Sequence, residues 1–321
     1  MPHHLRYQST EWALHHVVSR CINGFCFIKP TPAIVQICKG VLGRALAMYS
    51  TRIKLIHMAF LSNHSHLLLE SEDVHALSQF VQYLKSNLSR ELGREHDWRG
   101  PMWQSRFASE EILDEESLEE IFKYITENSV KEGLVDHPRA WRGLHGFHQL
   151  VDQVEQEGSW LNRTALFHAK QNTKTRDQVR ARDFMTSYEV ELTKPRMWSN
   201  LSEEQYHKRC VELCDEAVKS ARAKRAGRSM GMARVLAQPV FRARRPKRGT
   251  RPLCRAKTVE LFKAYRQKYW DFKKAFHAAY QHARDQVVAG ISPVEMLFPF
   301  GGIAPLSVIG LSELPDPVQR E

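Results

Sequence analysis

Two histidines separated by one residue are the first candidates for chemistry in this sequence. His64 and His66 open the segment His64 to Glu70, which is short, apolar and typical of a strand. Side chains two apart on a strand point to the same face, so both imidazoles could bind one metal ion. The chain contains 16 histidines, so a chance pair is the alternative until a second element supports the site.

A tyrosine and an asparagine downstream provide that second element. Tyr124 and Asn128 lie four apart in a predicted helix, and that spacing stacks them one turn apart on one face. The amide oxygen can complete a metal site, and the phenol then lies beside the ion. A free phenol, with a pKa of about 10, is a poor nucleophile at neutral pH. A metal ion would activate a phosphodiester toward attack by Tyr124. The alternative is a tyrosine packed in the core.

The elements that must position these residues follow from hydrophobic periodicity and capping signals. Strands are predicted at residues 12–20, 53–61, 64–70 and 106–113, and helices at 32–49, 74–94 and 114–128. Asp114 is the predicted N-cap of the helix that carries Tyr124. The order β-α-β-β-α-β-α predicts an α+β fold, with one antiparallel sheet and helices packed on one face.

The second half of the chain has a different character. Strand signals fade after residue 150, and segments 151–170, 202–226 and 256–289 are predicted to be helical. The chain is therefore predicted to divide into a domain at 1–150 and a mostly helical, basic region at 151–321.

Positive charge is concentrated in one part of that region. The net charge is +11, and residues 219–257 contain 14 Lys and Arg with no Asp or Glu, which leaves −3 (11 minus 14) for the rest. Such a segment indicates an anionic partner. We expect a DNA-binding arm here, including a Pro/Gly-interrupted loop at 242–252. The candidate phosphate contacts in the loop are Arg242, Arg244, Arg245, Lys247 and Arg248.

The composition also indicates in which cellular compartment the protein is expected. No apolar run approaches the roughly 20 residues that span a bilayer, and the N-terminus lacks the layout of a signal peptide. A cytosolic protein without a membrane partner is expected. The six cysteines form no CxxC pair and are expected to be reduced, although Cys210 and Cys214 could share a helix face and bind metal.

Four motifs, taken together and in order, resemble a known group of proteins. The sequence is similar to the HUH single-tyrosine transposase superfamily, and within it to the REP-associated tyrosine transposases, which carry the transposase IS200-like domain. The resemblance covers roughly residues 10–150. The matching pieces are Ser62 to Leu69, Lys85-Ser86, Gly100 to Phe107 and Tyr124 to Val135.

The resemblance implies a ferredoxin-like or RRM-like HUH nuclease core. It implies that His64 and His66 are metal ligands, that Asn128 supplies the third ligand, and that Tyr124 forms a 5′-phosphotyrosine. Imidazole ligands alone would favour zinc or a similar metal, whereas the family implies Mg²⁺ or Mn²⁺. The family commonly has proline at two positions that are Ser62 and Ser129 here, so the local backbone geometry differs while the chemical groups remain.

The expected function is metal-dependent cleavage and rejoining of single-stranded DNA near hairpins or palindromes. The expected protein is bacterial, cytoplasmic and nucleoid-associated, and is a monomer or a homodimer. Lys85, Trp103 and Arg106 are candidate DNA contacts, since arginine neutralises phosphate and aromatic rings stack on unpaired bases. For Trp103, closure of the sheet edge is an equal alternative. Two other functions remain open: a metal-dependent hydrolytic nuclease, and a non-catalytic regulator that binds DNA hairpins.

Overall fold

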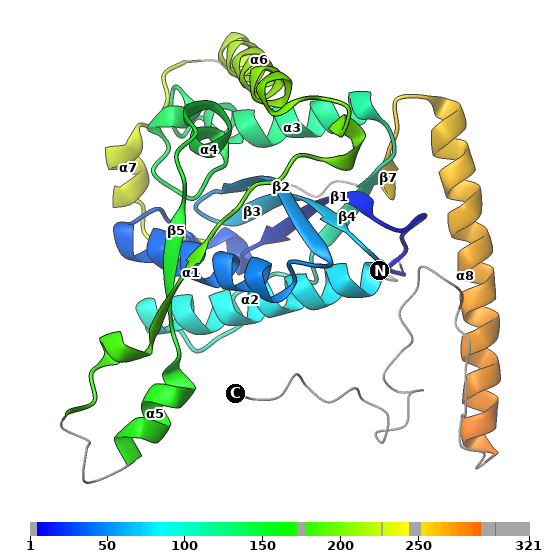
Figure 1. The fold of residues 1–321 in the computed structure, drawn as a ribbon, viewed down its shortest axis with the longest axis horizontal. Helices are drawn as coiled ribbons and strands as arrows, with labels where there is room; N and C mark the ends of the chain where they lie inside the picture. The colour runs from blue at the N-terminus through cyan, green and yellow to red at the C-terminus, as the bar shows by residue number, and fades with distance from the viewer. Residues whose placement is uncertain (1–4, 172–177, 226, 244–251, 290–298, 300–321) are drawn as a thin grey trace.

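A five-stranded sheet forms the centre of the protein (Figure 1). The structure, a computed structural model, describes residues 5–171, 178–225, 227–243, 252–289 and 299. The strand order is β2-β3-β1-β4-β7, with β1 antiparallel to β3 and β4, β2 antiparallel to β3, and β7 parallel to β4. The strands are β1 Ala13–Arg20, β2 Ile53–Phe60, β3 His64–Ser71, β4 Ala108–Ile112 and β7 Cys254–Arg255.

The helices of the first half begin and end close to the predicted positions. They are α1 Pro32–Met48, α2 Val74–Glu95 and α3 Glu115–Lys131. A short further helix, α4 Phe147–Asp152, was not predicted. The predicted cap of α3 is confirmed, because the Asp114 side chain accepts a hydrogen bond from the Ser117 backbone N–H at 2.7 Å. Acidic residues in the first turn of α3 favour the same start through the helix dipole.

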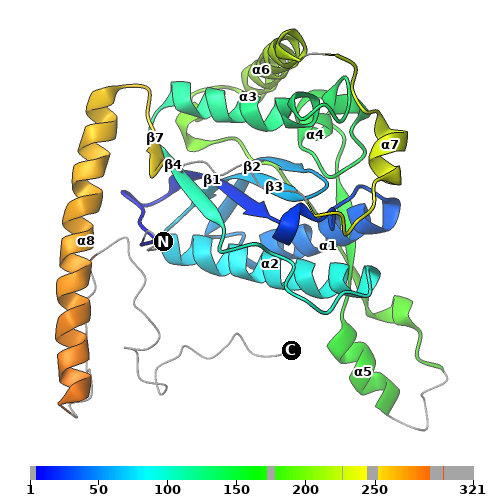
Figure 2. The ribbon, with the colours of Figure 1, turned by 180° about the vertical axis from the view of Figure 1, so that it is seen from behind.

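Helices cover both faces of the sheet, as Figures 1 and 2 show. The mixed α+β class and the mainly antiparallel sheet are confirmed, but the placement of all helices on one face is not. Leu67 and Leu69 of β3 pack in the cluster that contains residues of α1 and α2. Leu68 points the other way and packs against α3. Because the whole run from Leu67 to Leu69 is buried, β3 needs a covering layer on each side.

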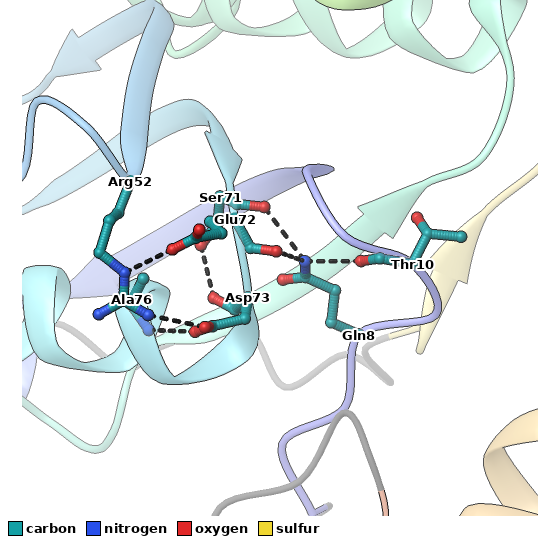
Figure 3. A network of polar contacts seen from close by, with 7 residues as sticks. All are labelled: Gln8, Thr10, Arg52, Ser71, Glu72, Asp73 and Ala76. Atoms are coloured by element: carbon teal, nitrogen blue, oxygen red, sulfur yellow. Dashed lines mark hydrogen bonds and ion pairs between the residues drawn. The ribbon is translucent and has the colours of Figure 1, made fainter.

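A network of hydrogen bonds and ion pairs fixes the end of β3 and the start of α2 (Figure 3). Asp73 caps α2 by accepting from the Ala76 N–H at 2.7 Å. Arg52 bridges Glu72 and Asp73, each at 2.6 Å. Gln8 donates to the carbonyl oxygens of three residues and so ties the N-terminal segment to the same corner.

Two strands in the second half were not expected from the sequence. β5 Glu157–Leu161 and β6 Met185–Glu189 form a separate antiparallel pair. The predicted helix at 151–170 is therefore wrong over β5, and its helical part is α5 Arg163–Gln171. Close approach to α1 explains the difference, because a Cβ on Gly40 or Gly158 would clash with the backbone of the other segment. Such a contact between distant residues leaves no local pattern in the sequence.

The remaining helices pack against the core. They are α6 Glu203–Lys224, α7 Met232–Ala237 and α8 Val259–Val288, so the predictions at 202–226 and 256–289 are confirmed. Arg209 of α6 pairs with Glu119 of α3, and β7 adds to the edge of the sheet. A domain boundary near residue 150 stays a prediction. No helix in the described part of the chain has the length and apolar character needed to cross a bilayer.

Candidate active site

The predicted histidines lie at one end of the sheet, on the face that α3 covers. The register places Val18 of β1 opposite His66 and Arg20 opposite His64. His16 is two residues before Val18 and therefore shares that face, as does its β4 partner Glu110.

Three imidazoles form a compact group, here called the histidine cluster: His16, His64 and His66. His16 Nε2 and His66 Nδ1 are 2.9 Å apart, and the two rings stack with centroids 5.2 Å apart. The rings of His64 and His66 meet edge to face at 5.0 Å. His64 Nδ1 donates to the Asn63 side-chain oxygen at 2.7 Å. In the neutral imidazole, Nε2 is then unprotonated and its lone pair can bind a metal ion.

His16 and His66 are buried, His64 is half-buried, and all three imidazoles are neutral. Burial lowers the pKa of His16 to about 3 and that of His64 to about 4, and it lowers the pKa of His66 well below its ordinary value. Arg255 adds to the lowering at His16, and Arg20 adds to it at His64. A neutral imidazole is the form that binds metal, so these surroundings favour the ligand state.

Tyr124 of α3 lies directly over the cluster. Its ring meets His66 edge to face at 5.4 Å between centroids and His16 at 5.9 Å. Lys131, two turns further along α3, has its Nζ 4.5 Å from the centre of the Tyr124 ring. Burial raises the pKa of Tyr124, Glu132 raises it further and Arg20 opposes the shift. The phenol is therefore protonated at neutral pH and needs positive charge near it to attack.

Asn128 is buried one turn after Tyr124, with 1% of its surface exposed. Neither its amide oxygen nor its amide nitrogen has a hydrogen-bond partner within the described residues, and the same holds for His66 Nε2. Buried polar atoms without partners cost about 1–3 kcal/mol each. The described chain contains no group of three or more His, Cys, Asp or Glu side chains arranged to hold a metal. The predicted ligand set contains only two such residues, since its third member is an amide.

Two of the candidate DNA contacts, Lys85 and Trp103, are linked through the loop that follows α2. Trp103 Nε1 donates to the Lys85 carbonyl at 2.9 Å, and Lys85 Nζ donates to the Ser105 carbonyl at 2.8 Å. The Gln104 N–H donates to the Arg20 carbonyl at 2.9 Å. The loop therefore borders the sheet end that carries His64.

The candidate DNA contacts Trp103 and Arg106 differ in how far they are exposed to solvent. Trp103 packs against the core under α1 and α2, and Arg106 is exposed. Burial lowers the pKa of Lys85 to about 8, and Arg6 contributes to the same shift.

The basic segment at 219–257 is only partly described. Arg242 is exposed, whereas Arg244, Arg245, Lys247 and Arg248 lie outside the described residues.

Several cations elsewhere in the segment meet acids from the first half of the chain. Arg255 pairs with Glu110 at 2.6 Å, Lys257 with Glu120 at 3.0 Å, and Arg225 with Asp136. The absence of acids within the segment therefore does not leave all of its charge unpaired.

Four residues near Tyr124 were not found from the sequence: His16, Arg20, Glu110 and Lys131. The spacing of His16 and Arg20 does place both on one face of the predicted first strand. That signal does not show which face, nor that β1 pairs with β3 in a register that joins His16 to His66. Lys131 follows Tyr124 by seven residues, which is two helical turns. Helix periodicity alone could therefore have predicted that Lys131 lies on the same face as Tyr124.

Comparisons with known proteins give one family match. Residues 33–128 match the family model described as "Transposase IS200 like", a range that includes His64, His66, Tyr124 and Asn128. The resemblance to these transposases is therefore confirmed. No protein of curated function matches the chain.

Solved structures that match part of the chain include two transposase structures. A REP-associated tyrosine transposase bound to a REP hairpin is 19% identical, with a TM-score of 0.37, over 46% of this chain and 84% of that chain. A proposed transposase from Deinococcus radiodurans R1 is 17% identical, with a TM-score of 0.28, over 36% of this chain and 91% of that chain.

Proposed function

We propose, from the IS200-like transposase match of residues 33–128, that this protein cuts and rejoins single-stranded DNA through a covalent bond to Tyr124. The observation that carries the proposal is the contact between the Tyr124 ring and His66, whose Nε2 is buried without a partner in the described chain. The proposed nucleophile therefore touches a histidine whose Nε2 could bind a metal ion. The substrate is DNA with a hairpin or palindrome beside a single-stranded flank, as the sequence resemblance implies.

The residues present fit a divalent metal ion. His64 and His66 are neutral and keep Nε2 free, and the amide of Asn128 lacks partners among the described residues although it is buried. These three side chains would hold the ion. The mixed imidazole and amide set is compatible with Mg²⁺ or Mn²⁺, and Mn²⁺ accepts both ligand types. When bound, the ion would supply positive charge at the scissile phosphate.

The covalent step is a phosphoryl transfer to tyrosine. The Tyr124 Oη–phosphorus bond forms while the bond between phosphorus and the 3′ oxygen breaks. The phenol loses its proton and the departing oxygen gains one, so the products are a 5′-phosphotyrosine and a free 3′-hydroxyl. Attack by a 3′-hydroxyl on the phosphotyrosine reverses the step and rejoins DNA without ATP. Arg20 and Lys131, which lie near the ring, would offset the negative charge that grows on the phosphate.

An adduct assay tests this proposal directly. Single-stranded DNA with a hairpin is labelled either at its 3′ end or at its 5′ end and incubated with the protein and Mn²⁺. A 5′-phosphotyrosine leaves the 3′-labelled fragment on the protein after boiling in detergent, and leaves the 5′-labelled fragment free. Tyr124→Phe should abolish the adduct while DNA affinity stays within about threefold, because only the hydroxyl is removed.

Tyr83→Phe is the matched control. Tyr83 lies on α2 and packs with Tyr49 on the other side of the sheet, so this variant should form the adduct normally. An adduct that persists in Tyr124→Phe and disappears in Tyr83→Phe would move the nucleophile to Tyr83.

A hydrolytic nuclease is the second candidate, and the raised pKa of Tyr124 favours it. In this case the metal site activates water, Tyr124 is only part of the scaffold, and cleavage leaves no adduct. Metal-dependent cutting by Tyr124→Phe would support this function. Hairpin binding without any cutting by the native protein would instead support a regulator.

We further propose a bacterial, cytoplasmic location with the nucleoid, where such DNA is found. A monomer or a homodimer is compatible with the proposed chemistry, and the mass in solution, by light scattering, distinguishes the two.

A further inference from the structure

α8 carries a line of positive side chains outside the family match. Residues at alternating spacings of three and four share one side of a helix. On this helix the cations of that side are Lys263, Arg266, Lys273, Lys274 and Arg284, and Trp270 and His277 lie among them. This set is called the α8 basic stripe below. Figure 1 shows α8 standing at the edge of the molecule beside β7.

The apolar side of α8 is already occupied. Tyr265, Tyr269, Phe272 and Phe276 are buried and form a cluster with Tyr7 of the N-terminal segment. Tyr265 also donates a hydrogen bond to the buried carboxylate of Glu111 at 3.1 Å. These contacts fix the rotation of α8 about its axis, so the stripe faces away from the buried cluster. The apolar side is already covered and cannot enter a membrane.

The stripe contains no acidic residue. The acids of α8 are Glu260, Asp271 and Asp285, and they lie along one border of the stripe, with Glu260 three residues before Lys263 and Asp271 three before Lys274. Asp271 accepts hydrogen bonds from Gln267. No salt bridge involves a stripe cation within the described residues. Trp270 is 41% exposed, and Lys273 Nζ lies 4.6 Å from the centre of its ring.

We propose that the α8 basic stripe binds the phosphate backbone of a double-stranded DNA stem. From Lys263 to Arg284 the helix rises about 32 Å at 1.5 Å per residue, close to the roughly 34 Å of one duplex turn. Paired strands present about one negative charge per 1.7 Å of axis, which suits a straight row of cations. Single strands are instead held by successive exposed aromatic rings, and the stripe offers one.

The inference rests on the proposed function for its class of ligand, the stem of the hairpin whose flank Tyr124 would cut. It adds a second surface, separate from the histidine cluster, that would select substrates with a duplex part. Loss of the stripe should therefore affect binding of the hairpin and leave the covalent step intact.

The test is a fourfold variant, Lys263, Arg266, Lys273 and Arg284 to Gln. Binding of a fluorescent hairpin with a single-stranded flank is measured by anisotropy between about 50 and 300 mM salt. We expect affinity to fall at least about tenfold and the slope of log affinity against log salt to flatten by up to about 3.6, since each phosphate contact contributes about 0.9. Binding of the flank alone, without a stem, should change less than about twofold, and adduct formation on it should be normal.

A charge-matched control removes four other exposed cations: Arg90, Lys170, Arg180 and Lys208, also to Gln. This control should bind the hairpin with nearly native affinity and slope. Equal weakening by both variants would reduce the effect to net charge and overturn the proposal. So would unchanged hairpin binding in the stripe variant, or equal weakening for the hairpin and the flank.

Two further measurements complete the test. If the fourfold variant does not fold by circular dichroism, the pairs Lys263 with Arg266 and Lys273 with Arg284 are replaced separately, and each should give about half of the slope change. Binding to anionic vesicles that depends on the stripe, with hairpin binding unaffected, would assign the surface to lipid and overturn the proposal. Absence of any adduct in the native protein, together with a stripe-dependent hairpin slope, would reject the proposed chemistry and retain this inference.

Discussion

At the residue scale, the bond between His16 and His66 gives His16 a positioning role in the proposed site. If His66 binds an ion through Nε2, its proton lies on Nδ1, and the nitrogen of His16 at 2.9 Å must accept it. Such a partner fixes the tautomer and the ring orientation of a ligating histidine. His16 itself is 4% exposed and stacks on His66, so it also limits rotation of that ring.

Replacing this acceptor should weaken metal binding. His16→Phe keeps an aromatic ring but cannot accept the proton, so the Mn²⁺ affinity should fall by about 10- to 100-fold. Electron paramagnetic resonance of free Mn²⁺ measures that affinity without DNA. His15→Phe is the control, because His15 points to the other face and bonds Gln8 at 3.0 Å. Native Mn²⁺ affinity in His16→Phe would remove the positioning role.

At the element scale, α3 depends on a single capping residue. Asp114 accepts from the Ser117 N–H at 2.7 Å and also from the Lys257 N–H at 2.6 Å. It therefore caps α3 and holds the chain that leads from β7 to α8. Tyr124 and Asn128 both lie on α3, so the geometry of the site depends on where this helix starts.

Removal of the Asp114 carboxylate should destabilise both the start of α3 and the chain that leads from β7 to α8. Asp114→Ala is expected to lower the free energy of unfolding by about 2 kcal/mol, at the upper end of capping effects, because two backbone donors lose their partner. Asp73→Ala removes only the Ala76 bond of α2 and the Arg52 pair, and a decrease of about 1 kcal/mol is expected. Urea denaturation compares the two. A smaller loss for Asp114→Ala than for Asp73→Ala would contradict the double role.

At the scale of the whole molecule, buried histidines link stability to pH. Burial lowers the pKa of His15 to about 3 and of His145 to about 4, and lowers the pKa of His57 well below 6.5. Unfolding returns each pKa to about 6.5, so the unfolded state binds more protons. The stability that these neutral imidazoles contribute is complete above about pH 6.5 and is lost as the pH falls toward 4 and 3.

The predicted effect is large at mildly acidic pH. Between about pH 7 and pH 5.5 each of these three histidines should cost about 1 kcal/mol of unfolding free energy. Burial raises the pKa of Glu70 and Glu111, which opposes the trend in part. Urea midpoints at the two pH values measure the difference. The three histidines of the histidine cluster, whose pKa values are also lowered, add to it, so His15→Asn should reduce it by about a sixth. Equal midpoints at both pH values would disprove the linkage.

A second prediction at this scale concerns the proposed DNA-binding arm at residues 219–257. Replacing Arg242, Arg244, Arg245, Lys247 and Arg248 with Ala should weaken binding of single-stranded DNA and flatten its salt dependence by about 0.7 for each phosphate that is no longer neutralised. A short oligonucleotide at saturating concentration should still be cut, because Tyr124 is untouched. Anisotropy titrations at several salt concentrations measure both quantities. Unaltered affinity and slope would show that these charges only face solvent.

The sequence by itself determined the elements that depend on neighbouring residues. Period-two and period-four spacings located the first three strands and α1 to α3, placed His64 and His66 on one face, and stacked Tyr124 over Asn128. The Asp114 cap was equally local, since its partner is three residues away. These features need contacts only within a strand or a helical turn. Such contacts join residues that are close in the sequence, so the spacing of the residues predicts them.

Only the tertiary structure decided how those elements meet. The β1–β3 register brought His16 to His66 across 50 residues, and β7 brought Arg255 to Glu110 across 145 residues. The covering of both sheet faces and the strands β5 and β6 were decided in the same way. Pairing between distant segments depends on which surfaces remain to be buried once the local elements exist. No spacing along the chain encodes that choice.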